Sequence, residues 1–126
     1  MTESELELVP MTEYPITIAE FRAWLETKRP TEIVGGRRNG FACPIARYLV
    51  ARGDGTVYVD TIEIASFSGV CLTPAWVAGF ARQVDDGREF LIRARTALRL
   101  LDRVAHATLP AEDDAERLAL EMEVVL

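Results

Sequence analysis

The chain has 126 residues, of which 49% are apolar and 27% charged, and its formal net charge is −6. This length and composition are typical of one soluble globular domain that folds around its own core. The net negative charge makes the phosphate backbone of a nucleic acid an unlikely partner.

Cysteine content and hydropathy narrow the class of protein further. Two cysteines, Cys43 and Cys71, are too few for a disulfide framework or a zinc site. The acidic start MTESELELVP lacks the apolar segment of a signal peptide. No apolar run approaches the roughly 20 residues that a membrane span requires. We therefore expect a cytoplasmic protein with reduced thiols and no membrane contact.

Residues 1–15 form the first predicted unit, which is either an acidic N-terminal tail or an edge strand. In the run ELELVPM charged and apolar residues alternate, as they do in an edge strand. Its acidity and terminal position favour a frayed tail instead. We expect the remaining residues, 16–126, to form a single globular domain.

The clearest helix start in the chain follows Thr17. Thr17 and Glu20 have the spacing of a capping box, and Ile16 and Phe21 have the spacing of a hydrophobic staple. Pro30 is expected to end this helix, because proline cannot continue the hydrogen-bond ladder.

A short extended segment and a glycine-rich loop, GGRRNG, are predicted next, followed by a second helix. Pro44 suits the first helical position, which places Cys43 at the N-cap. Gly53 has the position of a C-cap glycine, and the following GDG sequence predicts a turn.

The stretch TVYVDTIEIASF, residues 56–67, is rich in β-branched residues. We expect one strand with a bulge or bend near Asp60, which places its valines and isoleucines on one face. A hairpin turning at Asp60 and Thr61 is the alternative, although these are not preferred turn residues. The strand needs a partner, which is another segment of the chain or a second copy of it.

Two further helices are predicted in the second half of the chain. Thr73 and Pro74 have the pattern of an N-cap and first residue of a third helix. Asp86 and Glu89 have the spacing of a second capping box, which predicts a long fourth helix over residues 87–107.

A fifth helical pattern, AEDDAERLALEMEVVL, follows the break at ATLP. Its first turn is acidic, as the helix dipole favours, and we expect it to pack antiparallel to the fourth helix. The predicted fold is thus α+β and mostly helical, a single domain of about five helices with one small β-sheet.

The first candidate site is an anion-binding loop, residues 35–44. Glycine-rich backbone before a helix N-terminus attracts anions, and arginines clamp phosphate or carboxylate groups. The same dipole lowers the pKa of an N-cap thiol. The loop is not a P-loop, and the only histidine, His106, lies far away in the sequence, so a solvated loop with a buried cap is the simpler interpretation. The residues of this candidate site are Arg37, Arg38, Asn39 and Cys43.

The second candidate is a partner-binding face on the predicted fourth helix. Its residues are Arg88, Ile92, Arg95, Arg99 and Arg103. The alternative is an ordinary solvated face. An acidic protein partner, or the chain's own acidic C-terminal segment, suits these arginines better than DNA does, because the overall charge opposes DNA.

No pattern in the sequence indicates a metal site, a cofactor or a catalytic dyad. His106 has no second histidine at helical spacing, and the adjacent acidic pairs point in different directions on a helix. We predict a small non-enzymatic interaction or regulatory protein with a protein partner, or a homodimer. The alternative is a small anion-binding or thiol-active protein that uses residues 35–44.

Overall fold

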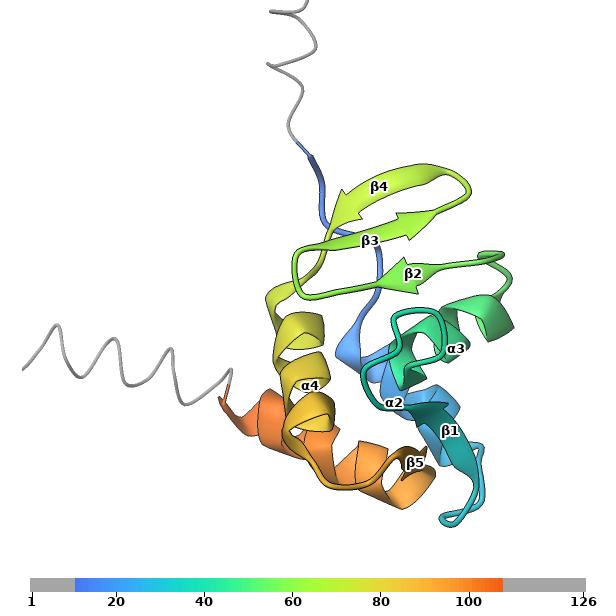
Figure 1. Ribbon diagram of the computed structural model, residues 1–126, viewed down its shortest axis with the longest axis vertical. Helices are drawn as coiled ribbons and strands as arrows, with labels where there is room; N and C mark the ends of the chain where they lie inside the picture. The colour runs from blue at the N-terminus through green and yellow to red at the C-terminus, as the bar shows by residue number, and fades with distance from the viewer. Residues whose placement is uncertain (1–10, 108–126) are drawn as a thin grey trace, which may run out of the picture.

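Two separate antiparallel sheets, rather than one, organise residues 11–107, the part of the chain that this computed structural model describes (Figure 1). Four helices accompany the sheets in this part, so the predicted mixed α+β class is confirmed. The expected single sheet is wrong, because two segments distant in the sequence pair on their own. The helices are α2 (Ile18–Glu26), α3 (Pro44–Arg52), α4 (Ala75–Asp86) and the helix over residues 94–107.

The predicted caps of the first two helices are confirmed. The Thr17 hydroxyl oxygen accepts a hydrogen bond from the Glu20 N–H at 3.1 Å, and α2 begins at the next residue. The Cys43 sulfur accepts from the Ala46 N–H at 3.4 Å, with Pro44 as the first residue of α3. Gly53 ends α3 in the left-handed conformation, with φ of 102°, as a C-cap glycine does.

The β-rich stretch folds, together with residues 68–72, as a three-stranded meander of β2 (Tyr58–Val59), β3 (Glu63–Ser66) and β4 (Gly69–Leu72). The predicted single strand with a bend is therefore wrong, and the hairpin alternative describes the path better. The Asp60 carboxylate stabilises the turn, because it accepts hydrogen bonds from the N–H groups of Ile62 and Glu63 at 2.8 and 2.7 Å.

The start of α4 also differs from the prediction. Pro74 occupies the N-cap without a side-chain hydrogen bond, and α4 begins at Ala75. Thr73 does not cap the helix, because its hydroxyl donates to the Asp60 carbonyl at 2.8 Å and so ties the end of β4 to the hairpin turn.

The predicted fourth helix over residues 87–107 is wrong in its first third. Residues Leu91–Arg93 form β5, which pairs antiparallel with β1 (Ile33–Gly36), and the helix begins only at residue 94. Asp86 is the last residue of α4 and caps nothing after it.

Backbone groups explain why the last helix starts at residue 94 without the predicted capping box. The N–H groups of Ala94 and Arg95 donate to the carbonyls of Glu32 and Pro30, at 2.9 and 3.0 Å. These bonds satisfy two of the four N–H groups that a helix start leaves without an intrahelical partner.

The core lies between the helices and the inner faces of both sheets, and an aromatic group occupies its centre. Phe21 is fully buried, and its ring lies 5.2 to 6.1 Å from four other aromatic rings. These contacts fit a packed core. The four rings belong to Trp24, Tyr48, Trp76 and Phe80.

The chain enters the described part beside the meander. The Leu72 N–H donates to the Thr12 carbonyl and the Tyr14 N–H donates to the Leu72 carbonyl, both at 2.9 Å, so Glu13 forms a parallel bridge with Leu72. The predicted edge strand or tail over ELELVPM lies almost entirely in residues 1–10, which are outside the described part. The predicted helix over residues 111–126 also lies outside it.

Candidate functional site

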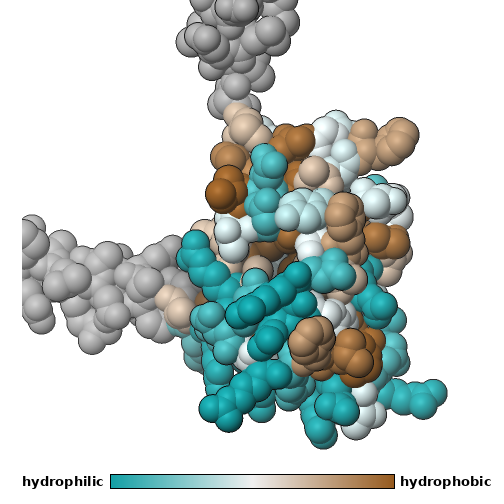
Figure 2. Space-filling view, in the orientation of Figure 1, coloured by the Kyte–Doolittle hydropathy of each residue, from teal (hydrophilic) through white to brown (hydrophobic). Residues whose placement is uncertain are grey.

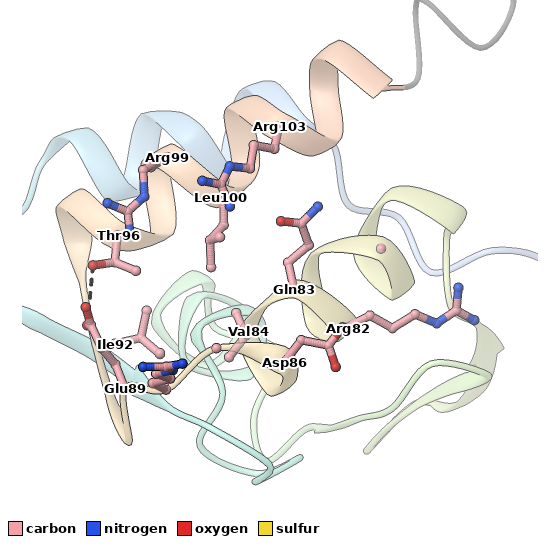
Figure 3. Close-up of a pocket in the computed structure, with 13 residues that line it drawn as sticks. Arg82, Gln83, Val84, Asp86, Glu89, Ile92, Thr96, Arg99, Leu100 and Arg103 are labelled. Carbon is pink, nitrogen blue, oxygen red and sulfur yellow. Dashed lines mark hydrogen bonds between the residues drawn. The ribbon is translucent and has the colours of Figure 1, made fainter.

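A groove of about 510 Å³ runs between α4 and the helix over residues 94–107 (Figure 3). Arg82 comes from α4, Arg88 from the connection after α4, and Arg99 and Arg103 from the last helix. We call this surface, defined by its four arginines, the arginine groove. It exists only because α4 and the last helix lie against each other.

The base of the arginine groove is apolar. Val84 of α4, Ile92 of β5 and Leu100 of the last helix line it between the two helical walls (Figure 3). All three are largely buried, with exposed fractions of 2%, 2% and 7%. The groove therefore combines a base that favours apolar side chains with a rim that favours negative charge.

The four arginines have no ion-pair partner among residues 11–107. Asp102, the acidic residue nearest to them in the last helix, instead pairs with Arg22 of α2 at 2.8 Å. The groove also contains Asp86 and Glu89, and the Glu89 carboxylate accepts a hydrogen bond from the Thr96 hydroxyl at 3.4 Å. Four guanidinium groups against two carboxylates leave the rim positively charged.

The net charge of the whole chain, −6, does not reflect this local excess of positive charge. Of the 20 acidic residues, nine lie in residues 1–10 and 108–126, together with one of the 14 basic residues. Residues 11–107 therefore carry 11 acidic and 13 basic side chains. The described part is weakly basic, although the chain as a whole is acidic.

The structure separates the five residues predicted for partner binding. Arg95, Arg99 and Arg103 lie on the last helix, as predicted, but Arg95 borders a shallow outer hollow instead of the groove. Arg88 precedes β5 rather than lying on a helix. Ile92 was expected among the exposed arginines, and this placement is wrong because pairing of β5 with β1 turns its side chain into the core.

Sequence reasoning missed the α4 wall of the groove. Arg82 and Gln83 line it, yet they appear in the sequence only as polar residues of an amphipathic helix. No local signal marks them, because their role depends on which face of α4 lies beside the last helix.

The candidate anion-binding loop engages groups of its own chain. The Arg37 guanidinium donates to the Gly87 carbonyl and lies 5.5 Å from the centroid of the Phe90 ring. The Arg38 N–H donates to the Asp85 carboxylate at 3.0 Å. The Asn39 side-chain oxygen accepts from the Phe41 N–H at 3.1 Å. A carboxylate of the protein itself thus occupies the N–H group that an external anion would use.

Cys43, near the end of this loop, lines a hollow of about 310 Å³ together with Arg38 and Asp85. Burial raises the pKa of the Cys43 thiol above its ordinary value, and it outweighs the N–H groups of α3, which act in the opposite direction. His106 is not beside the thiol, since its ring nitrogen Nδ1 contacts the Asp102 carbonyl on the last helix at 2.7 Å.

We predict that Cys43 reacts slowly with an aromatic disulfide reagent at neutral pH, because a raised pKa leaves little thiolate. The reaction rate should not exceed that of free cysteine, and comparison of Cys43→Ser with Cys71→Ser assigns the signal. A rate far above that of free cysteine, lost in Cys43→Ser alone, would contradict this prediction.

A second exposed surface is the outer face of the meander. The register places Tyr58, Ala65 and Val70 side by side across the three strands, and Leu72 lies on the same face. Figure 2 shows hydrophilic side chains over α4 and the last helix, whereas apolar side chains lie among polar ones over the meander and again over the region of β1 and β5. Phe67, at the turn between β3 and β4, is 98% exposed.

Within residues 11–107 no three His, Cys, Asp or Glu side chains converge in a way that could hold a metal ion. In the same range, no helix has both the length and the apolar character needed to cross a lipid bilayer. Compared with known protein families, curated proteins and solved structures, the chain matches none of them.

Proposed function

We propose that this protein is a non-enzymatic interaction module that binds an acidic, amphipathic helix of a protein partner in the arginine groove. The observation that carries the proposal is the set of four exposed arginines around an apolar base, none of which has an ion-pair partner among the described residues.

The shape and chemistry of the groove favour a helix as the occupant. An amphipathic helix places apolar residues against the space between two helices and its charged residues along the rim. Guanidinium groups match carboxylates in bidentate geometry, so glutamate and aspartate suit the rim. The base of Val84, Ile92 and Leu100 suits leucine or methionine side chains.

A nucleic acid fits the same surface less well. Asp86 and Glu89 lie within the groove and would face the phosphate groups of a nucleic acid backbone. The apolar base offers no polar group for reading a base edge.

The alternative function, anion or thiol chemistry at residues 35–44, has less support. Arg37, Arg38 and Asn39 already contact groups of the same chain, and burial raises the pKa of the Cys43 thiol. Asp85 would also repel an anion that entered the hollow beside the loop.

The proposal can be tested with a fluorescent, helix-forming peptide of 16 residues that carries glutamates on one face and leucines on the other. We expect Arg99→Glu and Arg103→Glu each to weaken its binding at least ~10-fold, which corresponds to about 1.4 kcal/mol. Raising the salt concentration should weaken binding as well.

Arg47→Glu is the matched control, because Arg47 is an exposed arginine on a helix, α3, and does not line the groove. It should change the affinity less than about twofold, and a peptide with glutamine in place of glutamate should bind poorly. Equal losses in Arg47→Glu and Arg99→Glu would overturn the proposal. So would a single-stranded oligonucleotide that binds more tightly than the acidic peptide at physiological salt.

A further inference from the structure

We infer that the hollow lined by Cys43 and Asp85 is a second binding site, which takes a small aromatic amine and holds its ammonium group with two carboxylates. We call this site the Cys43 hollow. Its volume of about 310 Å³ lies within the range that is typical of small-molecule sites. The inference goes beyond the proposed function, because it concerns a different surface and a different kind of ligand.

Four segments that are distant in the sequence build the Cys43 hollow (Figure 1). They are the loop at residues 38–40, the start of α3, β2 with the turn after it, and α4. Ala81 and Asp85 lie one helical turn apart on α4 and line the hollow, whereas Arg82 and Asp86 line the arginine groove. α4 therefore presents different polar residues to the two sites.

Part of the lining of the Cys43 hollow is apolar and aromatic. Ile45 of α3 and Phe80 and Val84 of α4 belong to it, and Val84 also borders the arginine groove. Tyr58 adds a partly exposed ring, whose centroid lies 5.0 Å from that of Phe41. Such a lining favours an aromatic ligand, and aromatic rings also attract an ammonium group.

Two carboxylates supply the polar part of the site. The Asp60 Oδ1 atom accepts two backbone N–H groups of the hairpin turn, and the Asp85 Oδ1 atom accepts the Arg38 N–H. Among residues 11–107, the Oδ2 atom of each aspartate has neither a hydrogen bond nor an ion pair. Each aspartate is thus fixed through one oxygen and can offer the other to a ligand.

The charge of the lining favours a cation. Asp60 and Asp85 carry two negative charges, and the Arg38 guanidinium carries the one positive charge of the lining. The Cys43 thiol adds no negative charge at neutral pH, because burial raises its pKa and the Asp85 carboxylate acts in the same direction. Arg38, Asn39 and Cys43, predicted as part of an anion site, therefore belong to a hollow of the opposite charge preference.

An amine fits this lining better than a metal ion does. Within residues 11–107 no three His, Cys, Asp or Glu side chains converge in a way that could hold a metal. An ammonium group has three N–H donors, two of which the free oxygens of Asp60 and Asp85 can accept. Hydrogen bonds between charged groups are about twice as strong as neutral ones.

Contacts within the chain hold the Cys43 hollow in shape. The Gly40 carbonyl accepts the Val59 N–H at 2.9 Å, which fixes the loop to β2. Arg38 has a φ of 56°, and its N–H bond to Asp85 fixes the loop to α4. A Cβ atom at Gly40 would lie 2.4 Å from the Tyr58 ring, so the loop packs tightly on β2. A site held in this way loses little conformational entropy on binding.

The experiment titrates the full chain with phenethylamine and follows the backbone amide signals in a proton–nitrogen NMR spectrum. We expect saturable shifts at Ala81 and Asp85, with a Kd below about 1 mM. Phenethyl alcohol and phenylacetate carry the same aromatic ring without the positive charge. Each should bind at least ~10-fold more weakly, because neither forms a charge-assisted hydrogen bond to a carboxylate.

A fourth probe separates a free amine from the side chain of a peptide. A capped lysine amide carries an ammonium group on an aliphatic stem and should also bind at least ~10-fold more weakly than phenethylamine, because it lacks the aromatic ring. Tighter binding of the capped lysine would overturn the small-amine inference and assign the hollow to a peptide.

Variants of α4 test the position of the ligand. Asp85→Asn removes the charge but keeps an oxygen acceptor for the Arg38 N–H, and should weaken phenethylamine binding ~10-fold. Asp86→Asn is the matched control, because Asp86 is the next residue and lines the arginine groove instead. It should change the affinity less than about twofold. Ala81→Leu fills the hollow and should abolish the saturable shifts.

Several results would overturn the inference. They are the absence of saturable shifts with phenethylamine, equal affinities for the amine, the alcohol and the acid, and equal losses in Asp85→Asn and Asp86→Asn. Undiminished binding by Ala81→Leu would place the ligand elsewhere. The proposed function is tested independently, since Arg99→Glu should weaken the acidic peptide and leave phenethylamine binding within about twofold. Loss of amine binding in Arg99→Glu would contradict the assignment to the Cys43 hollow.

Discussion

Replacing Gly35 with alanine is expected to lower the free energy of unfolding by about 3 kcal/mol. A Cβ atom at Gly35 would lie 2.4 Å from the Pro44 nitrogen, 2.6 Å from the Pro44 Cδ and 2.7 Å from the Cys43 carbonyl carbon. Two of these three atoms are backbone, so the first turn of α3 would have to move away from β1. The contact between β1 and α3 therefore requires a residue without a side chain.

Gly36→Ala is the matched control, because Gly36 is the next residue of β1 and its added Cβ would meet only the Phe90 carbonyl oxygen, at 3.9 Å. Its unfolding free energy should stay within about 0.5 kcal/mol of the unmodified chain. Urea denaturation followed by tryptophan fluorescence measures both variants. If Gly35→Ala proved as stable as Gly36→Ala, the tight packing of β1 on Pro44 would be refuted.

Replacing Arg52 with alanine is expected to cost about 2 kcal/mol of stability at neutral pH. The guanidinium binds both carboxylate oxygens of Asp54, at 3.0 and 2.6 Å, and donates to the Pro15 carbonyl at 2.8 Å. Its loss would leave Asp54 without its cation and would free the segment that leads into α2. Arg47→Ala, on the same helix but without an ion pair among the described residues, should stay within about 0.5 kcal/mol.

The cost of Arg52→Ala should depend on pH in a defined direction. The hydrogen bonds from Arg52 hold the pKa of Asp54 below its usual value, and the Tyr14 hydroxyl acts in the same direction. A lowered folded-state pKa stabilises the fold above the unfolded pKa, about 3.9, and this contribution is lost as pH falls through the folded value. The difference between Arg52→Ala and the unmodified chain should therefore shrink below about pH 4. An equal difference at pH 7 and pH 3 would contradict the role of this pair.

The parts of the fold that the sequence predicts well are those encoded by neighbouring residues. The caps at Thr17, Cys43 and Gly53 are each determined by residues within one helical turn, and all three are present in the structure. Such signals need no knowledge of the rest of the chain, because a cap satisfies its own helix end.

The parts predicted wrongly depend on contacts between distant residues. Residues 87–93 have a helical pattern, yet residues 91–93 pair with β1, and the carbonyls of Pro30 and Glu32 bond the start of the following helix. The arginine groove has the same origin. Arg99 and Arg103 were identifiable from helical spacing, whereas Arg82 joins them only through the packing of α4 beside the last helix.

The pairing of β1 with β5 has a consequence for synthesis of the protein. Gly36 pairs with Leu91, so residues 37–90, with two helices and the whole meander, lie between the two strands of one sheet. During translation, β1 leaves the ribosome long before its partner exists. Translation adds about 5–20 residues per second, so the hydrogen-bonding edge of β1 stays unpaired for several seconds. The sheet of β1 and β5 cannot form until residue 93 has left the ribosome.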